Sequence, residues 1–322
     1  MSGVISILIT LGLGFGLQRA SLCTVAAVQQ WLVERRPDRQ LAVGVAVCFS
    51  GVTLLGSAAF SPASGWLPAT LAVTPSILLG GVLLGLGSAL NGACFVGSVV
   101  RLTAGELNYG FSLLGLGFGL RVIEVYSVEA PPIEAAPPIA QAATLLAPIT
   151  VFLVLGTGAL AYGVQRAKSS GGQHAGARAD LPWLVATGIL AGLLFVRLPD
   201  WSYSAALAQL AAGQARLLWE TPPWSTLALF VGAAWSARRA GHLAWRAPSW
   251  AAASLCTVGG FIMALGAGLV PGGNDTLLLW SIPGLALHAA VAYGIMVLTL
   301  AAVIHGHRRL VGGTVTAVAG RE

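Results

Sequence analysis

Two cysteines stand where apolar runs of the sequence are interrupted, and their thiol groups are the first candidates for chemistry. Cys23 ends the interruption Gln18-Arg-Ala-Ser-Leu-Cys23, and Cys94 ends the interruption Asn91-Gly-Ala-Cys94. A helical run opens after Cys94, so its free backbone N–H groups and positive dipole end favour an anion beside the thiol. A thiol is a weak, polarizable donor, which suits it to holding a soft sulfur anion loosely. We therefore predict that Cys23 and Cys94 bind substrate.

The backbone around such interruptions is expected to supply hydrogen-bond donors. Asn91 and Gly92 belong to the second interruption, and Gly273 and Asn274 hold the related place in a later Pro-Gly-Gly-Asn-Asp segment. Asp275 ends that later segment and is costly if it lies at membrane depth. We predict a functional role or a helix-capping role for Asp275, and the sequence leaves both open.

Two arginines lie close to the interruption cysteines. Arg19 precedes Cys23 by four residues, and Arg101 follows Cys94 by seven. Each arginine is expected either to attract an anion or to reach the membrane surface or pair with a carboxylate. Glu106 is the expected ion-pair partner of Arg101.

Other chemistries are disfavoured by the pattern of the remaining residues. Cys48 and Cys256 lie inside apolar runs, where a cysteine is expected to act as a small buried hydrophobic residue. The histidines are scattered without metal-ligand spacing, and His288 is expected to be a packing residue. The chain lacks a phosphate-binding loop of the Gly-x4-Gly-Lys-Ser/Thr type. We therefore expect neither an enzyme nor a bound cofactor or metal, and any energy must come from a gradient, a partner or downstream consumption.

The composition indicates that the elements carrying these residues lie in a membrane. Only 9% of the 322 residues are charged, against about 25% in soluble domains, whereas 56% are hydrophobic. The mean hydropathy is +0.82. So few charges cannot cover a water-facing surface, so most of the surface is expected to face lipid. Several of the apolar runs reach the roughly 20 residues that cross a bilayer, and the runs are 41–60, 76–90, 107–123, 142–164, 222–236, 250–270 and 284–304.

The basic residues indicate the orientation and argue against a nucleic-acid partner, in spite of a net charge of +6. They cluster in four short polar gaps, whereas the gaps at 61–75 and 126–141 contain no Lys or Arg. This asymmetry is typical of cytoplasmic and outer loops respectively. We therefore place the four basic gaps in the cytoplasm, predict cytoplasmic N- and C-termini, and place the Pro-rich segment Ala130–Pro138 outside.

The two halves of the chain repeat each other. Gly80-Gly-Val-Leu-Leu-Gly-Leu-Gly matches Gly259-Gly-Phe-Ile-Met-Ala-Leu-Gly, 179 residues later, and an earlier glycine pattern repeats with a shift of 176. The basic gaps make each run of the first half cross in the opposite direction to its counterpart, so the repeats are expected to be inverted. We assign 1–126 to the first repeat, 127–181 to an outer loop, an extra crossing and a flexible cytoplasmic linker over 165–181, and 182–322 to the second repeat.

Polar or glycine-rich breaks fall at matching places in the two halves. They lie at 18–23 and 91–94 in the first half, and at 198–202 and 271–275 in the second. We expect the apolar runs before them to span only about 12–15 residues, or about 18–22 Å of helix, which is short for a crossing. Broken backbone at membrane depth is tolerated inside protein or along a cavity, and paired breaks of this kind are typical of transporter binding sites.

These motifs resemble the YeeE/YedE sulfur-transport family over nearly the whole chain. The resemblance lies in Gly14-Phe-Gly-Leu-Gln-Arg-Ala-Ser-Leu-Cys23, Gly85-Leu-Gly-Ser-Ala-Leu-Asn-Gly-Ala-Cys94 and Gly266-Ala-Gly-Leu-Val-Pro-Gly-Gly-Asn-Asp275. It implies an hourglass-shaped bundle with short helices meeting near the midplane, and uptake of thiosulfate or a related species by relay along cysteines. Thiosulfate transporters of the family also carry functional cysteines in the second repeat, where this chain has Pro199-Asp-Trp and Gly273-Asn-Asp. The implied role is therefore carried over to Cys23 and Cys94.

The sequence as a whole predicts an all-α polytopic membrane protein with two inverted repeats whose short, broken or re-entrant helices meet near the midplane. The predicted function is a permease of a bacterial inner membrane for a small sulfur-containing anion, with the lipid bilayer as its surroundings. Two alternatives stay open, a transporter of a selenium compound and a membrane thiol protein that hands sulfur to a cytosolic carrier protein. The predicted substrate-binding residues are Cys23, Cys94, Asn91, Gly92, Arg19, Arg101, Gly273, Asn274 and Asp275.

Overall fold

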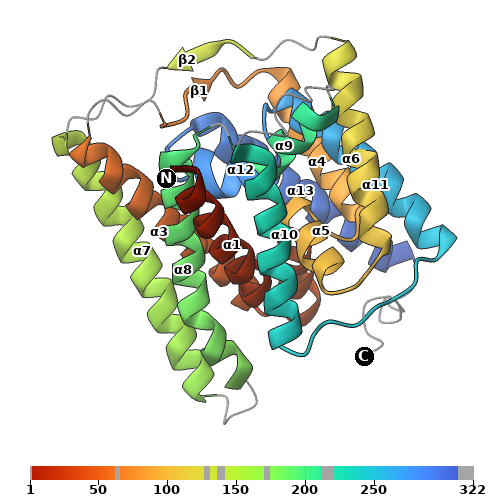
Figure 1. Ribbon diagram of the computed structural model, residues 1–322, viewed down its shortest axis with the longest axis horizontal. Helices are drawn as coiled ribbons and strands as arrows, with labels where there is room; N and C mark the ends of the chain where they lie inside the picture. Colours follow the sequence, from red (N-terminus) through yellow and green to blue (C-terminus); the bar gives the residue numbers. More distant parts are fainter. Residues whose placement is uncertain are drawn as a thin grey trace.

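Long helices make up most of the computed structural model, which describes residues 2–61, 66–126, 131–135, 142–169, 175–199, 201–211 and 221–310 (Figure 1). The long helices are α1 (Ser2–Ala20), α3 (Asp38–Phe60), α4 (Pro75–Asn91), α6 (Asn108–Val125), α7 (Ala142–Ser169), α8 (Ala175–Arg197), α10 (Thr221–Arg239), α11 (Trp250–Leu269) and α13 (Leu287–Leu310). The short helices are α2 (Thr24–Gln29), which continues as the π-helix η1 (Gln30–Glu34), α5 (Phe95–Thr103), α9 (Tyr203–Ala211), and α12 (Asn274–Thr276), which continues as the π-helix η3 (Leu277–Ser281). Two short strands, β1 (Thr70–Leu71) and β2 (Ile133–Ala135), pair antiparallel at one end of the bundle.

Six segments of the described chain are long and apolar enough to cross a membrane. They are Gly3–Glu34, Asp38–Phe60, Pro75–Thr103, Leu145–Arg166, Trp250–Leu269 and Leu287–Arg309. Their apolar residues lie on outer faces as well as inside, as the 61% exposure of Val154 on α7 and the 70% exposure of Leu298 on α13 illustrate. The chain is thus an all-α polytopic membrane protein, as the composition predicts.

All four predicted breaks interrupt the helices, but the predicted length of the preceding runs is wrong. α1, α4, α8 and α11 contain 19, 17, 23 and 20 residues. The elements too short to cross are those after the breaks, with nine residues in α5 and nine in α9. The longer helices extend over flanking residues that tolerate helix, such as Pro75 in the first turn of α4. α4 ends at Gly92, whose φ of 72° is the left-handed conformation that glycine adopts without strain.

Eight of the long helices pack in two sets of four, and each set contains two helices from either half of the chain. α1 packs against α10 and α8 against α3, whereas α4 packs against α13 and α11 against α6. α1 also packs against α8, and α4 against α11. In the sequence alignment of the two halves, the pair α1–α10 corresponds to the pair α8–α3, and the pair α4–α13 corresponds to the pair α11–α6.

Glycines allow α4 and α11 to cross with their backbones in contact. A methyl group on Gly80 would lie 2.9 Å from the carbonyl oxygen of Gly266, and one on Gly266 would lie 2.7 Å from that of Gly80. Gly87 and Gly259 approach each other in the same reciprocal way, at 2.7 and 2.8 Å. Small residues at helix crossings let membrane helices pack closely, because lipid provides no hydrophobic drive for their association.

The predicted linker is wrong over most of its length. α7 continues to Ser169 and α8 begins at Ala175, so residues 165–169 and 175–181 are helical. They are rich in Ala, Arg and Gln, which favour helix even in a polar segment. Residues 170–174 lie outside the described chain, as do residues 130 and 136–138 of the Pro-rich segment around β2.

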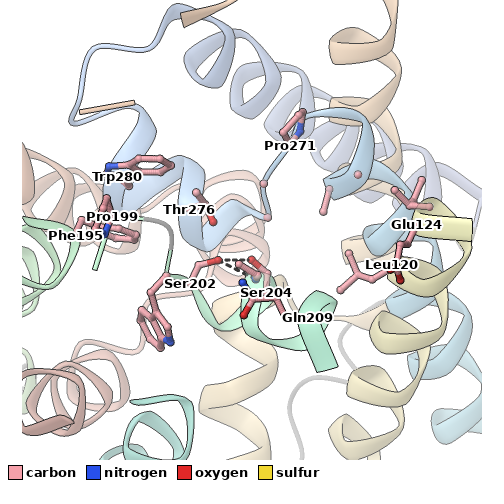
Figure 2. Close-up of a pocket in the computed structure, with 17 residues that line it drawn as sticks. Leu120, Glu124, Phe195, Pro199, Ser202, Ser204, Gln209, Pro271, Thr276 and Trp280 are labelled. Atoms are coloured by element: carbon pink, nitrogen blue, oxygen red, sulfur yellow. Dashed lines mark hydrogen bonds between the residues drawn. The ribbon is translucent and has the colours of Figure 1, made fainter. Parts of the chain in front are cut away.

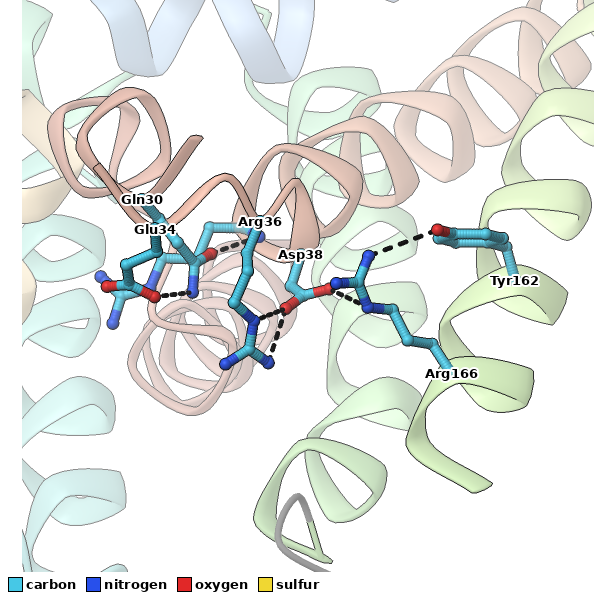
Figure 3. A network of polar contacts seen from close by, with 7 residues as sticks. Gln30, Glu34, Arg36, Asp38, Tyr162 and Arg166 are labelled. Carbon is cyan, nitrogen blue, oxygen red and sulfur yellow. Dashed lines mark hydrogen bonds and ion pairs between the residues drawn. The ribbon is translucent and has the colours of Figure 1, made fainter. Parts of the chain in front are cut away.

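A polar network ties the basic gaps together at the end of the bundle opposite the strands (Figure 3). Asp38 at the start of α3 pairs with Arg36 at 2.9 Å and with Arg166 of α7 at 3.3 Å. Arg308 near the end of α13 donates to the carbonyl oxygen of Leu32 at 3.2 Å. We call this the basic end. In Figure 1, α1 starts toward the strand end and runs toward the basic end.

Candidate functional site

Four short helices begin at the four breaks, and each begins after a small residue. Cys23 precedes α2 and Cys94 precedes α5, both with extended backbone at the cap position. Ser202 and Gly273 hold the same places before α9 and α12, where their carbonyl oxygens accept the first helical bonds at 2.9 and 3.0 Å. The two breaks of the first half thus present thiols, and those of the second half present a hydroxyl group and a glycine.

The structure brings the two predicted cysteines together. The Cys94 thiol donates to Cys23 Sγ at 3.9 Å, and the Thr24 backbone N–H donates to Cys94 Sγ at 3.3 Å. Both cysteines are buried and belong to the free cysteines of the described chain. Gly97 makes room for this pair, because a methyl group there would overlap Cys23 Sγ.

Asn274 joins the second half to this thiol pair. Its side-chain oxygen accepts from the Phe95 N–H at 3.0 Å, and its amide nitrogen donates to Thr24 Oγ1 at 3.3 Å. Thr24 Oγ1 also lies 3.3 Å from the Tyr293 hydroxyl group of α13. The fully buried amide of Asn274 therefore connects the starts of α2 and α5, so its side chain rather than its backbone reaches the first half.

Asp275 lies beside this cluster and faces the start of α9. Its carboxylate accepts from the Ser204 N–H at 3.3 Å and lies 3.0 Å from Ser204 Oγ through either oxygen. Ser204 Oγ lies 2.9 Å from Ser202 Oγ. The intervening Tyr203 donates its hydroxyl hydrogen to the Phe95 carbonyl oxygen at 2.7 Å. α9 and α12 are therefore bound to each other and to the start of α5.

The other predicted site residues lie apart from the thiol pair. Asn91 stabilises its own break, because its amide donates to the Ala93 carbonyl oxygen at 2.7 Å and to Ser98 Oγ at 2.8 Å. Gly92 is the left-handed end of α4, and Gly273 is the residue before α12. These three residues shape the breaks.

The two predicted arginines do not line the thiol pair. Arg101 pairs with Glu106 at 3.4 Å, as predicted, and its guanidinium lies over the Tyr109 ring at 5.4 Å. It stands at the end of α5, toward the basic end. Arg19 lies at the end of α1, before the turn that leads to Cys23, and is half-buried.

Two other sequence predictions concern cysteine and histidine. Cys256 is buried on α11, where its thiol lies 3.9 Å from the Asn91 carbonyl oxygen, whereas Cys48 is half-buried where α3 meets α7. His288 is buried and accepts from the Leu71 N–H at 3.1 Å, as a satisfied packing residue does. Among the described residues, no cluster of three His, Cys, Asp or Glu side chains could hold a metal ion.

A cavity of about 440 Å³ lies beside α9 and α12, toward the strand end, and Figure 2 shows its wall. We call it the large cavity. Ser202, Ser204 and Thr276 supply hydroxyl groups to its wall, and Trp201 and Trp280 supply aromatic rings. Trp280 donates its ring N–H to the Trp66 carbonyl oxygen at 2.7 Å, which ties this wall to the segment before β1.

Two small voids continue from the large cavity toward the thiols. The carboxyl void, of about 20 Å³, is lined by Asp275 and Tyr203 and shares Trp201 and Ser202 with the large cavity. The thiol void, of about 10 Å³, is lined by Cys23, Cys94 and Asn274. It shares Leu17, Val96 and Leu279 with the carboxyl void. Each void is about the size of one water molecule, so the route is closed to a larger solute in this structure.

Several residues of the site escaped the sequence prediction. Thr24, Ser202, Tyr203 and Ser204 directly follow or occupy the breaks, and this position was the signal that could have found them. Trp201 flanks an apolar run, where tryptophan typically anchors a chain at the membrane surface, but it is buried and lines the large cavity. Tyr293 lies in the middle of an apolar run and carried no local signal.

Comparisons with known proteins agree with these features. A family model described as sulphur transport matches residues 19–302, which is most of the chain. The chain is also similar to the probable transporter YedE of Escherichia coli (strain K12) and to that of Salmonella typhimurium (strain LT2), with 29% identity over 119 residues in each case. These matches cover 36% of this chain and 28% of each relative, so the alignment spans a minor part of the relatives' length.

Proposed function

This chain belongs to the sulphur transport family, and we propose that it is a permease that carries a small sulfur-containing anion, such as thiosulfate, across a bacterial inner membrane. The observation that carries the proposal is the pair of buried thiols, 3.9 Å apart, at the starts of α2 and α5. A route of cavities leads to this pair from the strand end of a membrane protein.

The thiols are suited to hold a sulfur anion without trapping it. S–H groups are weak donors and sulfur is polarizable, so a soft anion gains several weak contacts instead of one strong ion pair. The Thr24 and Phe95 N–H groups lie beside the thiols and add backbone donors, although both are occupied here, by Cys94 and Asn274. An anion that replaces these two acceptors would receive both N–H groups. We propose that it passes from one thiol to the other in this way, by exchange of hydrogen bonds.

We also propose that the two halves are inverted repeats that meet at this site. The proposal rests on the sequence repeat and on the reciprocal contacts of Gly80 with Gly266 and of Gly87 with Gly259. In the sequence alignment Gly80 corresponds to Gly259 and Gly87 to Gly266, so a two-fold axis would convert the contact of Gly80 with Gly266 into the contact of Gly259 with Gly87. A self-complementary contact of this kind is typical of two-fold symmetry. The repeats are 1–126 and 182–322, except that α8 brings the start of the second to Ala175.

The proposed orientation places the basic end in the cytoplasm, because basic residues are retained on that side of a membrane. The large cavity then opens to the outside, and the solute meets the hydroxyl groups of α9 before the thiols. α1 starts toward the strand end, so this orientation puts its first turn outside. We therefore replace the predicted cytoplasmic amino terminus with an outer one and keep a cytoplasmic end for α13.

Uptake of labelled thiosulfate tests the proposed function. Cells that make the wild-type protein should accumulate the label, whereas Cys23→Ala and Cys94→Ala should each lose most of the uptake. Cys48→Ala is the matched control, because Cys48 lies at the contact of α3 with α7 and should leave uptake unchanged. Immunoblots of membranes must find equal amounts of the four proteins.

The outcomes separate the parts of the proposal. If both site variants transport as well as the wild type, the role of the thiols is refuted. If the wild type does not take up thiosulfate, the same cells are tested with sulfite, sulfide and selenite, and uptake of selenite would replace the sulfur substrate with a selenium compound. Transfer of sulfur to a cytosolic carrier protein stays a prediction.

A further inference from the structure

Asp275 is a buried carboxyl group in the wall of the proposed route, and its surroundings do not neutralise a charge. Asp275 is 6% exposed, and its carboxyl group accepts from the backbone N–H and the hydroxyl group of Ser204 and from the backbone N–H groups of Thr276 and of Asp275 itself. Within the described part of the chain, no basic side chain forms an ion pair with it. A carboxylate without a cation is costly inside a membrane protein, and binding of a proton removes that cost.

The hydroxyl groups of Ser204 and Ser202 connect this carboxyl group to the large cavity. Ser204 Oγ lies 3.0 Å from both carboxyl oxygens and 2.9 Å from Ser202 Oγ. Both serines line the large cavity, where Figure 2 shows their side chains meeting. Ser202 Oγ accepts from the Ala205 N–H at 3.0 Å, which leaves its own hydrogen free to point to Ser204 or to the cavity.

This chain of groups is complete in two opposite directions. With an ionised carboxylate, Ser202 donates to Ser204 and Ser204 donates to Asp275. With a protonated carboxyl group, Asp275 donates to Ser204, Ser204 donates to Ser202, and Ser202 donates into the cavity. Transfer of a proton from a hydronium ion in the cavity to Asp275 converts the first hydrogen-bond direction into the second, because each serine oxygen receives one hydrogen and gives one up, and the hydronium ion is left as water. No other reactant is needed.

The other ionisable groups near Asp275 are already engaged. α9 contributes Tyr203, whose hydroxyl group donates to the Phe95 carbonyl oxygen. α5 contributes Arg101 at its far end, paired with Glu106, and the preceding Cys94 donates to Cys23. η3 carries no ionisable side chain. Glu124 of α6, which lines the large cavity, pairs with Arg121 at 2.7 Å.

We propose that Asp275 is a proton-binding site, loaded from the large cavity through Ser202 and Ser204, and that one proton binds together with each transported anion. The inference rests on the proposed function for the identity of the anion. An anion that moves from the large cavity to the thiol void passes the carboxyl void, where an ionised Asp275 repels it and a protonated one does not. By linkage, an anion that binds better to the protonated site also makes the proton bind better. The proton leaves on the cytoplasmic side after the anion does.

Purified protein in liposomes with a pH-sensitive dye inside tests the proton site. Thiosulfate uptake by the wild type should fall as the outside pH is raised, and the fall should approach about tenfold for each pH unit once most of the carboxyl groups are ionised, at subsaturating anion. Each addition of thiosulfate should acidify the interior. Asp275→Asn, which resembles the protonated state, should give uptake without pH dependence and without acidification. Glu34→Gln removes an exposed carboxylate at the basic end, away from the three cavities, and should behave as the wild type.

Infrared difference spectra of the same proteins provide a readout that does not depend on the anion. The wild type should show a protonated carboxyl band that disappears as the pH is raised, and Asp275→Asn should lack it. Ser202→Ala should keep the band, because the carboxyl group remains, but should slow acidification.

The outcomes distinguish this inference from the proposed function. The proton site is overturned if Asp275→Asn shows the same pH dependence and acidification as the wild type. It is also overturned if uptake by the wild type does not change with pH. If the wild type transports none of the sulfur anions but shows the carboxyl band, the proposed function fails and the proton site stands. If the band is absent from the wild type, the proton site fails whatever is transported.

Discussion

Replacement of Gly97 by alanine adds one methyl group at the place where the Cys23 thiol lies. The new carbon would overlap Cys23 Sγ, and it would lie 3.1 Å from Cys23 Cβ and 3.2 Å from Ala93 Cβ. Non-bonded carbon atoms are most stable at about 3.5–4.0 Å, so the sulfur atom must move by about 1 Å or more, or α5 must shift. Either movement disrupts the contact between Cys23 and Cys94, which carries the proposed function.

The size of the effect follows from two opposing contributions to the free energy of unfolding. Overpacking of a full site costs about 1–3 kcal/mol, whereas alanine in place of glycine in a helix contributes about 0.5–1 kcal/mol. Gly97→Ala should therefore lower the free energy of unfolding by roughly 0–2.5 kcal/mol. Loss of a hydrogen bond worth about 1 kcal/mol in the site corresponds to about fivefold, so we expect at least that reduction in the initial rate of thiosulfate uptake.

Gly44→Ala is the matched control, because nothing lies within 4 Å of a methyl group at this position of α3. It should leave uptake unchanged and should not lower the thermal unfolding temperature in detergent. If Gly97→Ala takes up thiosulfate as fast as Gly44→Ala and unfolds at the same temperature, the Cys23 thiol is not held where the structure places it. That result would refute the reasoning.

Three further changes test the scaffold. Gly87→Ala should lower the free energy of unfolding by about 1–3 kcal/mol, because its methyl group would lie 2.7 Å from the Gly259 carbonyl oxygen. Thermal unfolding in detergent, with Gly44→Ala as the reference, measures this difference. Asn274→Ala leaves the buried Phe95 N–H without its acceptor and should cost about 1–3 kcal/mol in the same assay, so an unchanged unfolding temperature would contradict the bridge. Asp38→Asn removes two half-exposed ion pairs and should cost only about 0–1 kcal/mol, a difference that should shrink further in high salt.

The sequence predicted where the helices break better than it predicted what the residues at the breaks do. Glycine and polar residues mark a break locally, and all four breaks were found from them. The pairing of Arg101 with Glu106 was also predictable, since both lie within one short turn. The role of Asn274 was not predictable, because its partners Thr24 and Phe95 are far away in the chain and only the crossing of the two halves brings them together.

The same limit applies to backbone donors and to aromatic residues. Asn91 and Gly92 looked like anion-binding residues because they precede a helix start, but the Asn91 side chain binds its own turn. Trp201 looked like a membrane anchor because it flanks an apolar run. Whether such a residue faces lipid or a cavity depends on how far the following helix folds back into the bundle, and the local pattern does not contain that information.

Passage of an anion requires the short helices to move, because the carboxyl void and the thiol void each hold about one water molecule. The long helices resist movement where backbones touch, as at Gly80 and Gly87. The start of α5 is held differently, by three hydrogen bonds from other elements. Phe95 uses its N–H with Asn274 and its carbonyl oxygen with Tyr203, and Cys94 accepts from Thr24.

Three such bonds at about 0.5–1.5 kcal/mol each amount to about 1.5–4.5 kcal/mol, a cost at which an open minor state is still populated. The thiol void is bounded by the groups that make two of these bonds, so an anion that enters it can replace the acceptors that the N–H groups lose. Binding and opening would then be the same event. We therefore expect the start of α5 to be the moving part of the route, with the Phe95 N–H exchanging Asn274 for the anion when thiosulfate is added, seen as a change in the NMR chemical shift of the Phe95 amide that is absent in Cys94→Ala.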